Sequence, residues 1–337
     1  MISTICTVFE GHYHKGVAGL TNSLQANGYE GIIWAGYKGQ LPRWAKLEAK
    51  ENHAKSVGTT IKAKENHVGS VETIIKIEEN YAGSVETMIV SNEITINFIK
   101  LADATFLPYC KPDFMLNVLQ RMPELDNIFF FDCDIIVKCR FSYFEEWVEC
   151  GIALCEDVNS PLPISHPLRF QWQNYFAKYG VSVERRDNYY VNGGFIGLKV
   201  GDKEILEHWR HAQNLMMHEL KEISSIGFKD RTNPFHRTDQ DALNVAKDMT
   251  NRPLSIADGT AMDLSNYGFI MSHAVGNQKP WQKNWIAFVI KHGQRPTMTD
   301  RLFMNHITTP LSIFTPRERF VKRWNLRVAS ALSRVLA

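Results

Sequence analysis

The first 35 residues predict a parallel β-sheet, and this pattern constrains the fold more than any other feature of the chain. Residues 2–9 (ISTICTVF) are apolar and rich in β-branched side chains, which is typical of a buried strand. Residues 16–27 carry apolar side chains at helical spacing, and Gly28 is the expected C-terminal cap. Residues 31–35 (GIIWA) predict a second strand. The order strand, helix, strand favours an α/β fold with a parallel sheet.

The same alternation resumes further along the chain. Strands are expected at residues 94–99, 127–131, 135–137, 152–155 and, with a glycine break, 189–200. Helices are expected at residues 113–121, 202–222 and 238–248. The 337 residues would suffice for two domains or for one large α/β domain. We predict one α/β domain over residues 1–290, with a central, mostly parallel sheet flanked by helices, and a C-terminal extension over residues 291–337.

A 14-residue sequence occurs three times between residues 50 and 91. The copies start at Lys50, Lys64 and Glu78. In each copy a valine and an isoleucine lie four residues apart, which would place them on one helical face, but the ETIIK core is equally typical of a strand. Three copies are about the minimum for a stacked solenoid. We interpret the repeat as a duplicated surface insertion, in preference to a binding module.

Charge is distributed unevenly along the chain. The net charge of +2 is too small to indicate nucleic-acid binding by the whole protein. Residues 315–337, however, hold six Lys/Arg and one Glu, which leaves the rest of the chain at about −3. An apolar helical arc is expected here, formed by Phe320, Val321, Trp324, Val328, Ala331, Leu332 and Val335. Such a basic amphipathic helix suits an anionic membrane surface, and docking on the domain is the alternative.

The cysteines and the apolar runs bear on the compartment. None of the six cysteines forms a C-x-x-C pair, so we expect reduced thiols, with two buried disulfides as the competing interpretation. No run reaches 18 apolar residues, and the first residues lack the basic region of a signal peptide. We therefore expect a cytoplasmic protein, peripheral on the inner face of the cytoplasmic membrane if its C-terminal helix binds lipid.

Two carboxylates follow the buried strand at 127–131. Asp132 and Asp134 are separated only by Cys133, so both side chains can turn toward one hard cation. A divalent ion held there can bridge a diphosphate and stabilise its charge as it leaves. An Asp-x-Asp pair is common by chance, but ligands in open α/β sheets bind at the carboxyl ends of strands. The alternative is a solvated turn.

A rarer pattern lies at residues 273–281, which read H-x-x-G-x-x-K-P-W. His273 can supply a nitrogen ligand to a metal such as Mn²⁺. Gly276 allows backbone N–H groups to approach a phosphate, and Lys279 supplies a cation for it. The alternative for this segment is a purely structural loop with a packed tryptophan.

Two further segments have both a structural and a functional interpretation. Asp239 and Gln240 open a predicted helix, where Thr238 or Asp239 could simply cap the helix N-terminus. Asn192 precedes two glycines, which are typical of a strand bulge or of close approach between the backbone and a sugar.

Taken together and in this order, the segments resemble the family 8 glycosyltransferases. The resemblance is carried by Tyr13, FFDCDIIV at 130–137, YVNGGFIGL at 190–198, DQDALN at 239–244 and HAVGNQKPW at 273–281. It implies a GT-A-type fold and a retaining, metal-dependent transfer of a hexose, glucose or galactose. The implied donor is a UDP-sugar, the cofactor is Mn²⁺ (or Mg²⁺), and the acceptor is a glycan or a lipid-linked sugar in surface polysaccharide or lipopolysaccharide synthesis.

The resemblance also implies a role for each candidate residue. The implied metal ligands are Asp132, Asp134 and His273, and the implied diphosphate contacts are Gly276 and Lys279. The implied uridine pocket consists of Val8, Phe9 and Tyr13, with Tyr13 stacking on the base. The implied contacts to the donor sugar are Asn192, Asp239 and Gln240, and Lys111 is a further donor contact. The resemblance places Gln240 on the β-face of the anomeric carbon. Asp239 and Gln240 are the catalytic candidates.

The chain departs from the family pattern in three places. Relatives usually have Asn-Asp before the tyrosine, where this chain has Gly11 and His12. Asn192 is followed by two glycines rather than by a Ser or Ala and one glycine. The triple repeat has no counterpart in the family pattern. Two rival functions are a sugar-phosphate nucleotidyltransferase and an inactive nucleotide-sugar or carbohydrate-binding protein. The first needs a glycine-rich basic loop after the first strand, which the sequence EGHYHKG does not supply.

Overall fold

The computed structural model describes residues 1–45, 85–103, 106–184, 187–218 and 234–336. The first two copies of the 14-residue repeat and the first half of the third lie outside these residues. The last residues of the third copy contribute β3 (Glu86–Ile89), an edge strand that pairs antiparallel with β4. For this part of the repeat the strand alternative is therefore the correct one.

Eight strands form the central sheet in the order β3-β4-β2-β1-β5-β8-β7-β9. Besides β3, they are β1 (Ser3–Glu10), β2 (Gly31–Lys38), β4 (Ile94–Lys100), β5 (Asn127–Phe131), β7 (Ile152–Cys155), β8 (Phe195–Lys199) and β9 (Leu254–Ala257). Strand β8 runs antiparallel to both its neighbours, and the edge strand β3 is antiparallel to β4; the remaining pairs are parallel. The expected α/β class with a central, mostly parallel sheet is confirmed.

Helices cover both faces of this sheet, so its central strands are buried on both sides. In β5 the neighbours Phe129 and Phe130 point to opposite faces and enter different cores. One core includes α1 (His14–Ala26) and α4 (Ser142–Glu149); the other includes α3 (Lys111–Arg121), α5 (Pro167–Ala177), α6 (Glu204–Met216) and α7 (Thr238–Met249). Truncating either phenylalanine to alanine would cost about 3–5 kcal/mol of folding free energy.

Helix α1 ends as its sequence predicts. Gly28 follows the helix with φ +79°, and its N–H donates to the Gln25 carbonyl at 3.0 Å. The Tyr29 N–H donates to the Leu24 carbonyl at 3.0 Å, which completes a Schellman motif. The chain then turns directly into β2, as the predicted order of strand, helix and strand requires.

A second, two-stranded sheet brings two distant motifs together. Strand β6 (Ile135–Val137) pairs antiparallel with β10 (Met271–His273), and Ile135 lies opposite His273. The Ala274 N–H also donates to the carbonyl of Asp134 at 3.0 Å. Because of this pairing, residues far apart in the sequence meet just beyond the carboxyl end of β5.

Several predicted bounds and elements differ from the structure. The segment expected as a strand at 189–200 holds a shorter β8, because Gly193 and Gly194 form a turn before it. The helix expected at 202–222 is α6, which ends at Met216. The sequence analysis did not single out α4, α5, β9, β10, α8 (Trp285–His292) or α9 (Met298–Asn305).

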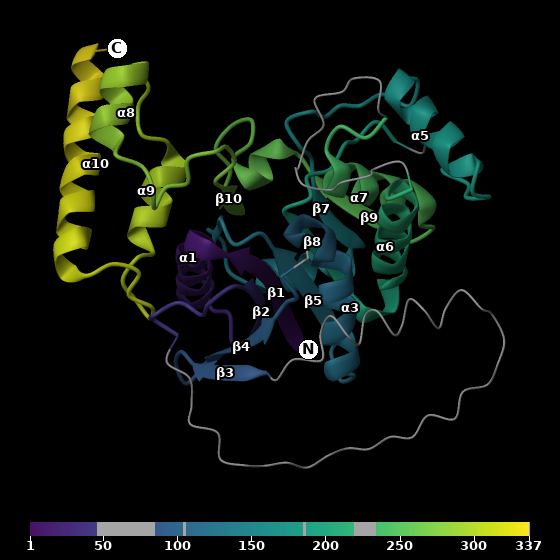
Figure 1. Cartoon of the computed structure of the whole chain (residues 1–337), viewed down its shortest axis with the longest axis horizontal. Helices are drawn as coiled ribbons and strands as arrows, with labels where there is room; N and C mark the ends of the chain where they lie inside the picture. The colour runs from purple at the N-terminus through teal and green to yellow at the C-terminus, as the bar shows by residue number, and fades with distance from the viewer. Residues whose placement is uncertain (46–84, 104–105, 185–186, 219–233, 337) are drawn as a thin grey trace.

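The C-terminal helices α8, α9 and α10 (Pro316–Leu336) lie together on one side of the molecule, and α5, α6 and α7 lie on the other (Figure 1). Helix α10 packs against α8 through Asn325, Leu326 and Ala329. In contrast, Phe320, Trp324 and Val335 are 71%, 55% and 83% exposed. The helix therefore docks on the domain. Of the apolar arc that the sequence predicts, Leu332 packs against the core, whereas Phe320, Trp324 and Val335 do not.

Two further findings concern the cysteines and the length of the apolar helices. All six cysteines are free thiols in the structure, and four of them are buried. Among the described residues no helix combines the length and the apolar character that crossing a bilayer would require.

Candidate functional site

A pocket of about 450 Å³ opens where the central strands β1, β5 and β7 end and β8 begins. All twelve residues singled out from the sequence line it: Val8, Phe9, Tyr13, Lys111, Asp132, Asp134, Asn192, Asp239, Gln240, His273, Gly276 and Lys279. They come from segments spread over most of the chain. The sheet brings them together because parallel strands, with their following loops, end at one common edge.

Asp132, Asp134 and His273 form a cluster that could hold a metal ion. One ligand atom from each lies within 4.8 Å of the others. His273 Nε2 is 3.2 Å from Asp134 Oδ1 and 3.8 Å from Asp132 Oδ2. Two carboxylate oxygens and one imidazole nitrogen suit Mn²⁺ or a similar divalent ion. The donor set and its spacing therefore fit the metal that the sequence predicts.

Lys111 links the carboxylates of two motifs. Its Nζ lies 2.9 Å from Asp132 Oδ1 and 3.5 Å from Asp239 Oδ2, and it donates to the Gly193 carbonyl at 2.8 Å. The ammonium is buried at the first turn of α3. Burial alone would lower the pKa of Lys111, but Asp132 and Asp239 together raise it above its ordinary value. Lys111 is thus a fixed positive charge between the metal cluster and the start of α7.

Lys279 holds the other carboxylate of the cluster. Its Nζ donates to Asp134 Oδ2 at 2.6 Å and to the Ala274 carbonyl at 2.7 Å. Burial alone would raise the pKa of Asp134, but His273 and Lys279 hold it below its ordinary value. Asp134 is therefore ionised at neutral pH, which a metal ligand must be.

Two glycines let the backbone come close enough to form this cluster. A Cβ on Gly194 would lie 2.6 Å from His273 Cε1 and 3.0 Å from Asp132 Oδ2. A Cβ on Gly16 in α1 would lie 2.4 Å from the carbonyl oxygen of Cys133. Any larger residue at these positions would push the Asp-Cys-Asp segment or the histidine away.

The loop after β10 owes its shape to a glycine and a tryptophan. Gly276 has φ +100°, and space for a Cβ is free there, so the backbone conformation is what requires glycine. Trp281 packs edge-to-face against Tyr13, with ring centroids 5.7 Å apart. Its Nε1 donates to His12 Nδ1 at 2.9 Å. His12, which departs from the family pattern, therefore anchors this loop beside Tyr13.

Hydrogen bonds fix the polar groups at the opposite side of the pocket. Gln240 Oε1 accepts from the Gly193 N–H at 3.1 Å, and its Nε2 has no hydrogen-bond partner among the described residues. Asn192 Nδ2 donates to Asp157 Oδ2 at 2.7 Å. Burial raises the pKa of Asp239, although Lys111 opposes this shift. The pocket thus presents two amides and two carboxylates beyond the metal cluster.

The sequence analysis missed four charged residues that line this pocket: Glu10, Lys38, Asp157 and Arg237. Asp157 follows β7 by two residues, and β7 runs in the same direction as β5, so the rule that selected Asp132 would also have selected Asp157. Arg237 lies two residues before Asp239, at the N-terminal cap of α7. No motif indicated Arg237, because an isolated arginine carries no pattern.

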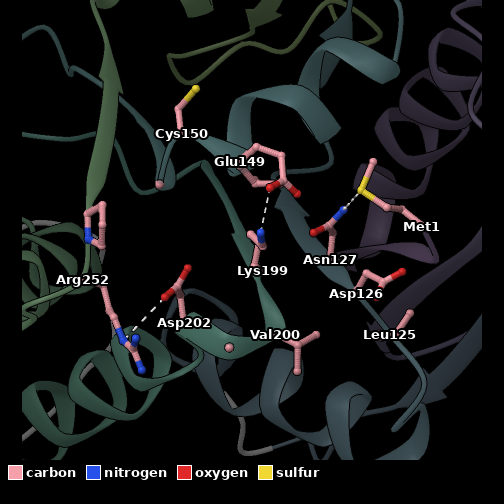
Figure 2. Close-up of a pocket in the computed structure, with 14 residues that line it drawn as sticks. Met1, Leu125, Asp126, Asn127, Glu149, Cys150, Lys199, Val200, Asp202 and Arg252 are labelled. Atoms are coloured by element: carbon pink, nitrogen blue, oxygen red, sulfur yellow. Dashed lines mark hydrogen bonds and ion pairs between the residues drawn. The ribbon is translucent and has the colours of Figure 1, made fainter.

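A second pocket, of about 610 Å³, lies at the other end of the same strands (Figure 2). Met1 and Asn127, at the starts of β1 and β5, line it together with Lys199 at the end of β8. Its basic side chains pair with nearby carboxylates: Lys199 with Glu149 at 2.7 Å and Arg252 with Asp202 at 3.5 Å. The groups of this pocket are largely exposed and do not converge on one point, so the first pocket is the better candidate.

Comparisons with known proteins give only distant likenesses. No sequence profile of a known family matches the chain, and no curated protein matches it. Among solved structures, the bifunctional glycosyltransferase WbbM aligns with TM-score 0.46 and 11% identity, over 97% of this chain and 52% of WbbM. The galactosyltransferase LgtC, in complex with donor and acceptor sugar analogues, gives 0.44 and 12%, over 95% of this chain and 99% of LgtC.

The glycosyltransferase GlyE of Streptococcus pneumoniae gives TM-score 0.44 and 11% identity, over 98% of this chain and 64% of GlyE. The chain therefore spans about half of WbbM and just under two thirds of GlyE. These likenesses are weak, and the case for a function rests on the geometry of the pocket.

Proposed function

We propose that this protein is a retaining glycosyltransferase of the family 8 type, with a GT-A fold. It would move a hexose, glucose or galactose, from a UDP-sugar to a glycan or a lipid-linked acceptor. The proposed setting is the synthesis of surface polysaccharide or lipopolysaccharide. The observation that carries the proposal is the convergence of Asp132, Asp134 and His273 with two buried lysines at the carboxyl end of the sheet.

The pocket offers a place for each part of such a donor. Val8, Phe9 and Tyr13 would hold the uridine, because they lie at the end of β1 beside the metal cluster. Gly276 and Lys279 would contact the diphosphate through a backbone N–H and an ammonium. Asn192, Asp239, Gln240 and Lys111 would hold the sugar, since all four line the pocket beyond the metal cluster.

Asp132, Asp134 and His273 would hold Mn²⁺ or Mg²⁺, which when bound supplies positive charge to the diphosphate as it leaves. Lys279 would add a second charge at the same place, and its buried position makes that charge effective. The bond between the anomeric carbon and the diphosphate oxygen breaks, and UDP leaves with the electron pair.

The acceptor hydroxyl would then attack the anomeric carbon from the face that UDP leaves. Its oxygen forms the new glycosidic bond, and its proton passes to the departing diphosphate oxygen. Gln240 would lie on the opposite face and stabilise the cationic sugar without forming a bond. This route needs no strong nucleophile in the protein, and a covalent sugar trapped on Asp239 or Gln240 would overturn it.

The test is release of UDP and free sugar from a panel of UDP-hexoses with Mn²⁺, compared with Asp134→Ala. We expect slow hydrolysis of one donor, lost on chelation and lost by more than about 10³-fold in the variant. Asp202→Asn, in the pocket at the other end of the strands, is the control and should hydrolyse the donor at the wild-type rate.

Two outcomes would favour the rival functions. Metal-dependent UDP binding without turnover, with or without sugar acceptors, would indicate an inactive binding protein. Release of pyrophosphate from UTP and a sugar phosphate would indicate a nucleotidyltransferase. Absence of nucleotide binding would exclude the proposed function altogether.

The proposed partners include an anionic membrane surface, contacted through α10. Phe320, Val321, Trp324 and Val335 are more than half exposed, and four exposed arginines lie on the same helix: Arg317, Arg323, Arg327 and Arg334. Apolar and basic side chains together favour reversible binding to anionic lipid. The protein should co-sediment with vesicles containing phosphatidylglycerol, and Phe320→Ala with Trp324→Ala should abolish this. Equal sedimentation with neutral vesicles would contradict the proposal.

A further inference from the structure

The cations that line the candidate site differ in whether they form an ion pair with a carboxylate. Lys279 Nζ lies 2.6 Å from Asp134 Oδ2, and Lys111 Nζ lies 2.9 Å from Asp132 Oδ1. Lys38, at the mouth beside β1, lies 3.6 Å from Glu10. Arg237 also lines the pocket and is exposed, yet no carboxylate of the described residues lies within ion-pair distance of its guanidinium. Within the described part of the pocket, Arg237 is thus the cation without a carboxylate partner.

Hydrogen bonds to Asp241 hold the backbone of Arg237 in place. Its backbone N–H donates to Asp241 Oδ2 at 2.8 Å, and the His236 N–H donates to the same oxygen at 2.7 Å. Asp241 is itself buried and accepts from the Tyr190 hydroxyl at 2.6 Å. The side chain is long, but its base is held at the start of α7 by a buried, fully bonded carboxyl.

Arg237 belongs to the sugar end of the pocket rather than to the metal end. Arg237 lies two residues before Asp239 and three before Gln240. Asp239 and Gln240 lie beside Gly193, and Lys111 separates them from Asp134 and the metal cluster. The exposed side chain of Val158 lines the same pocket, next to Asp157 at the end of β7. A group that enters the pocket beyond the donor sugar would therefore meet Arg237.

We propose that Arg237 selects the acceptor, and that this acceptor carries an anionic group, a phosphate or a carboxylate, close to the hydroxyl that receives the sugar. This inference rests on the proposed function. A guanidinium binds either anion through two parallel N–H donors, and such charge-assisted bonds are among the stronger polar contacts in proteins. Lys111 and Lys279 contact carboxylates of the site and are assigned to the donor in the proposed function, which leaves Arg237 to bind an anionic group of the acceptor.

The experiment uses the full chain saturated with UDP and Mn²⁺ and measures binding of small acceptor probes by calorimetry. The probes are galactose, galactose 6-phosphate and galacturonate. We expect one or both anionic probes to bind about tenfold or more tightly than galactose. Arg237→Gln should remove this preference, and Arg237→Lys should restore part of it. Arg252→Gln, in the pocket at the other end of the strands, should leave it unchanged.

Each outcome separates the two proposals. Equal binding of neutral and anionic probes, or binding of none of them, would overturn the role of Arg237 while UDP binding keeps the transferase proposal intact. Weaker UDP binding in Arg237→Gln would also overturn it, because the arginine would then serve the donor diphosphate. The preference for phosphate over carboxylate, or the reverse, names the anion.

Discussion

The two pockets at opposite ends of the central strands hold similar charged groups in different settings. At the carboxyl end, Lys111 and Lys279 are buried and contact carboxylates from distant segments. At the other end, Lys199 and Glu149 pair at 2.7 Å while their side chains remain 44% and 48% exposed. An exposed pair contributes little, whereas a buried one is costly to break. Burial and convergence, rather than pocket volume or charge, therefore distinguish the candidate site.

The largest expected difference between the two ends comes from removing one lysine at each. Lys111→Met leaves the buried Asp239 and the partly buried Asp132 without the ammonium that lies between them, and we expect a loss of about 3–5 kcal/mol in the free energy of unfolding. Lys199→Met removes an exposed pair, and we expect a loss of at most about 1 kcal/mol. Denaturant unfolding at neutral pH, with Mn²⁺ removed, measures both.

Similar losses for the two lysine variants would contradict the comparison. A loss at Lys111 that disappears when Mn²⁺ is added would sharpen it, because the ion would then replace the missing positive charge.

A smaller but more specific difference is expected from one methyl group at each end. In Gly194→Ala the new Cβ would lie 2.6 Å from His273 Cε1, so the histidine must move away from the carboxylates. We expect Mn²⁺ to bind about 10²-fold more weakly, since ligand positions decide metal affinity. Gly201→Ala, in the second pocket, has no atom within 4 Å of its Cβ and is the matched control.

Calorimetric titration of each alanine variant with Mn²⁺, after a check of secondary structure by circular dichroism, gives the comparison. Unchanged Mn²⁺ affinity in Gly194→Ala would argue against a metal site formed by Asp132, Asp134 and His273.

The smallest expected effect is a pH dependence of stability at the buried end. Burial raises the pKa of Asp241 to about 7, against about 3.9 in an unfolded chain. The folded state therefore holds this proton more tightly than the unfolded state. The stability that the protonated carboxyl contributes is present below pH ~4 and is lost as the pH rises from ~4 to ~7.

Asp241→Asn keeps a neutral side chain that can still accept from the His236 and Arg237 N–H groups. The free energy of unfolding of the wild type, measured relative to this variant, should fall by about 1 kcal/mol or more between pH 4.5 and pH 7.5. This range lies roughly between the unfolded and the folded pKa of Asp241. A difference that rises with pH would show that Asp241 is ionised throughout and stabilised by its three donors.

Much of the fold was predictable because its strands are short apolar runs buried on both faces. The strands at 127–131, 135–137 and 152–155 have the predicted bounds, and Gly28 caps α1 as expected. Helices α8 and α9 were missed, although Asn284 and Thr297 cap their N-termini. Strand β10 was also missed, because three residues are too few to show a period.

The face that α10 uses for docking could not be read from its sequence. Periodicity predicted that Phe320 and Trp324 would lie on one arc, but not whether that arc faces protein or solvent. The structure buries Leu326 and Ala329 instead, and Asn325 Oδ1 accepts from the Ile286 N–H in the first turn of α8.

The sequence by itself determined the chemistry available to this protein: two aspartates at a strand end, and a histidine, a glycine and a lysine in one loop. The tertiary structure alone decided that these groups meet, because pairing of β6 with β10 sets His273 beside Asp134 across 139 positions of the chain. The tertiary structure also decided which charged side chains form ion pairs. Lys111 is matched by carboxylates from two other segments, whereas no carboxylate in the described part of the chain pairs with Arg237, and only the packing of α3 and α7 around the sheet could fix that difference.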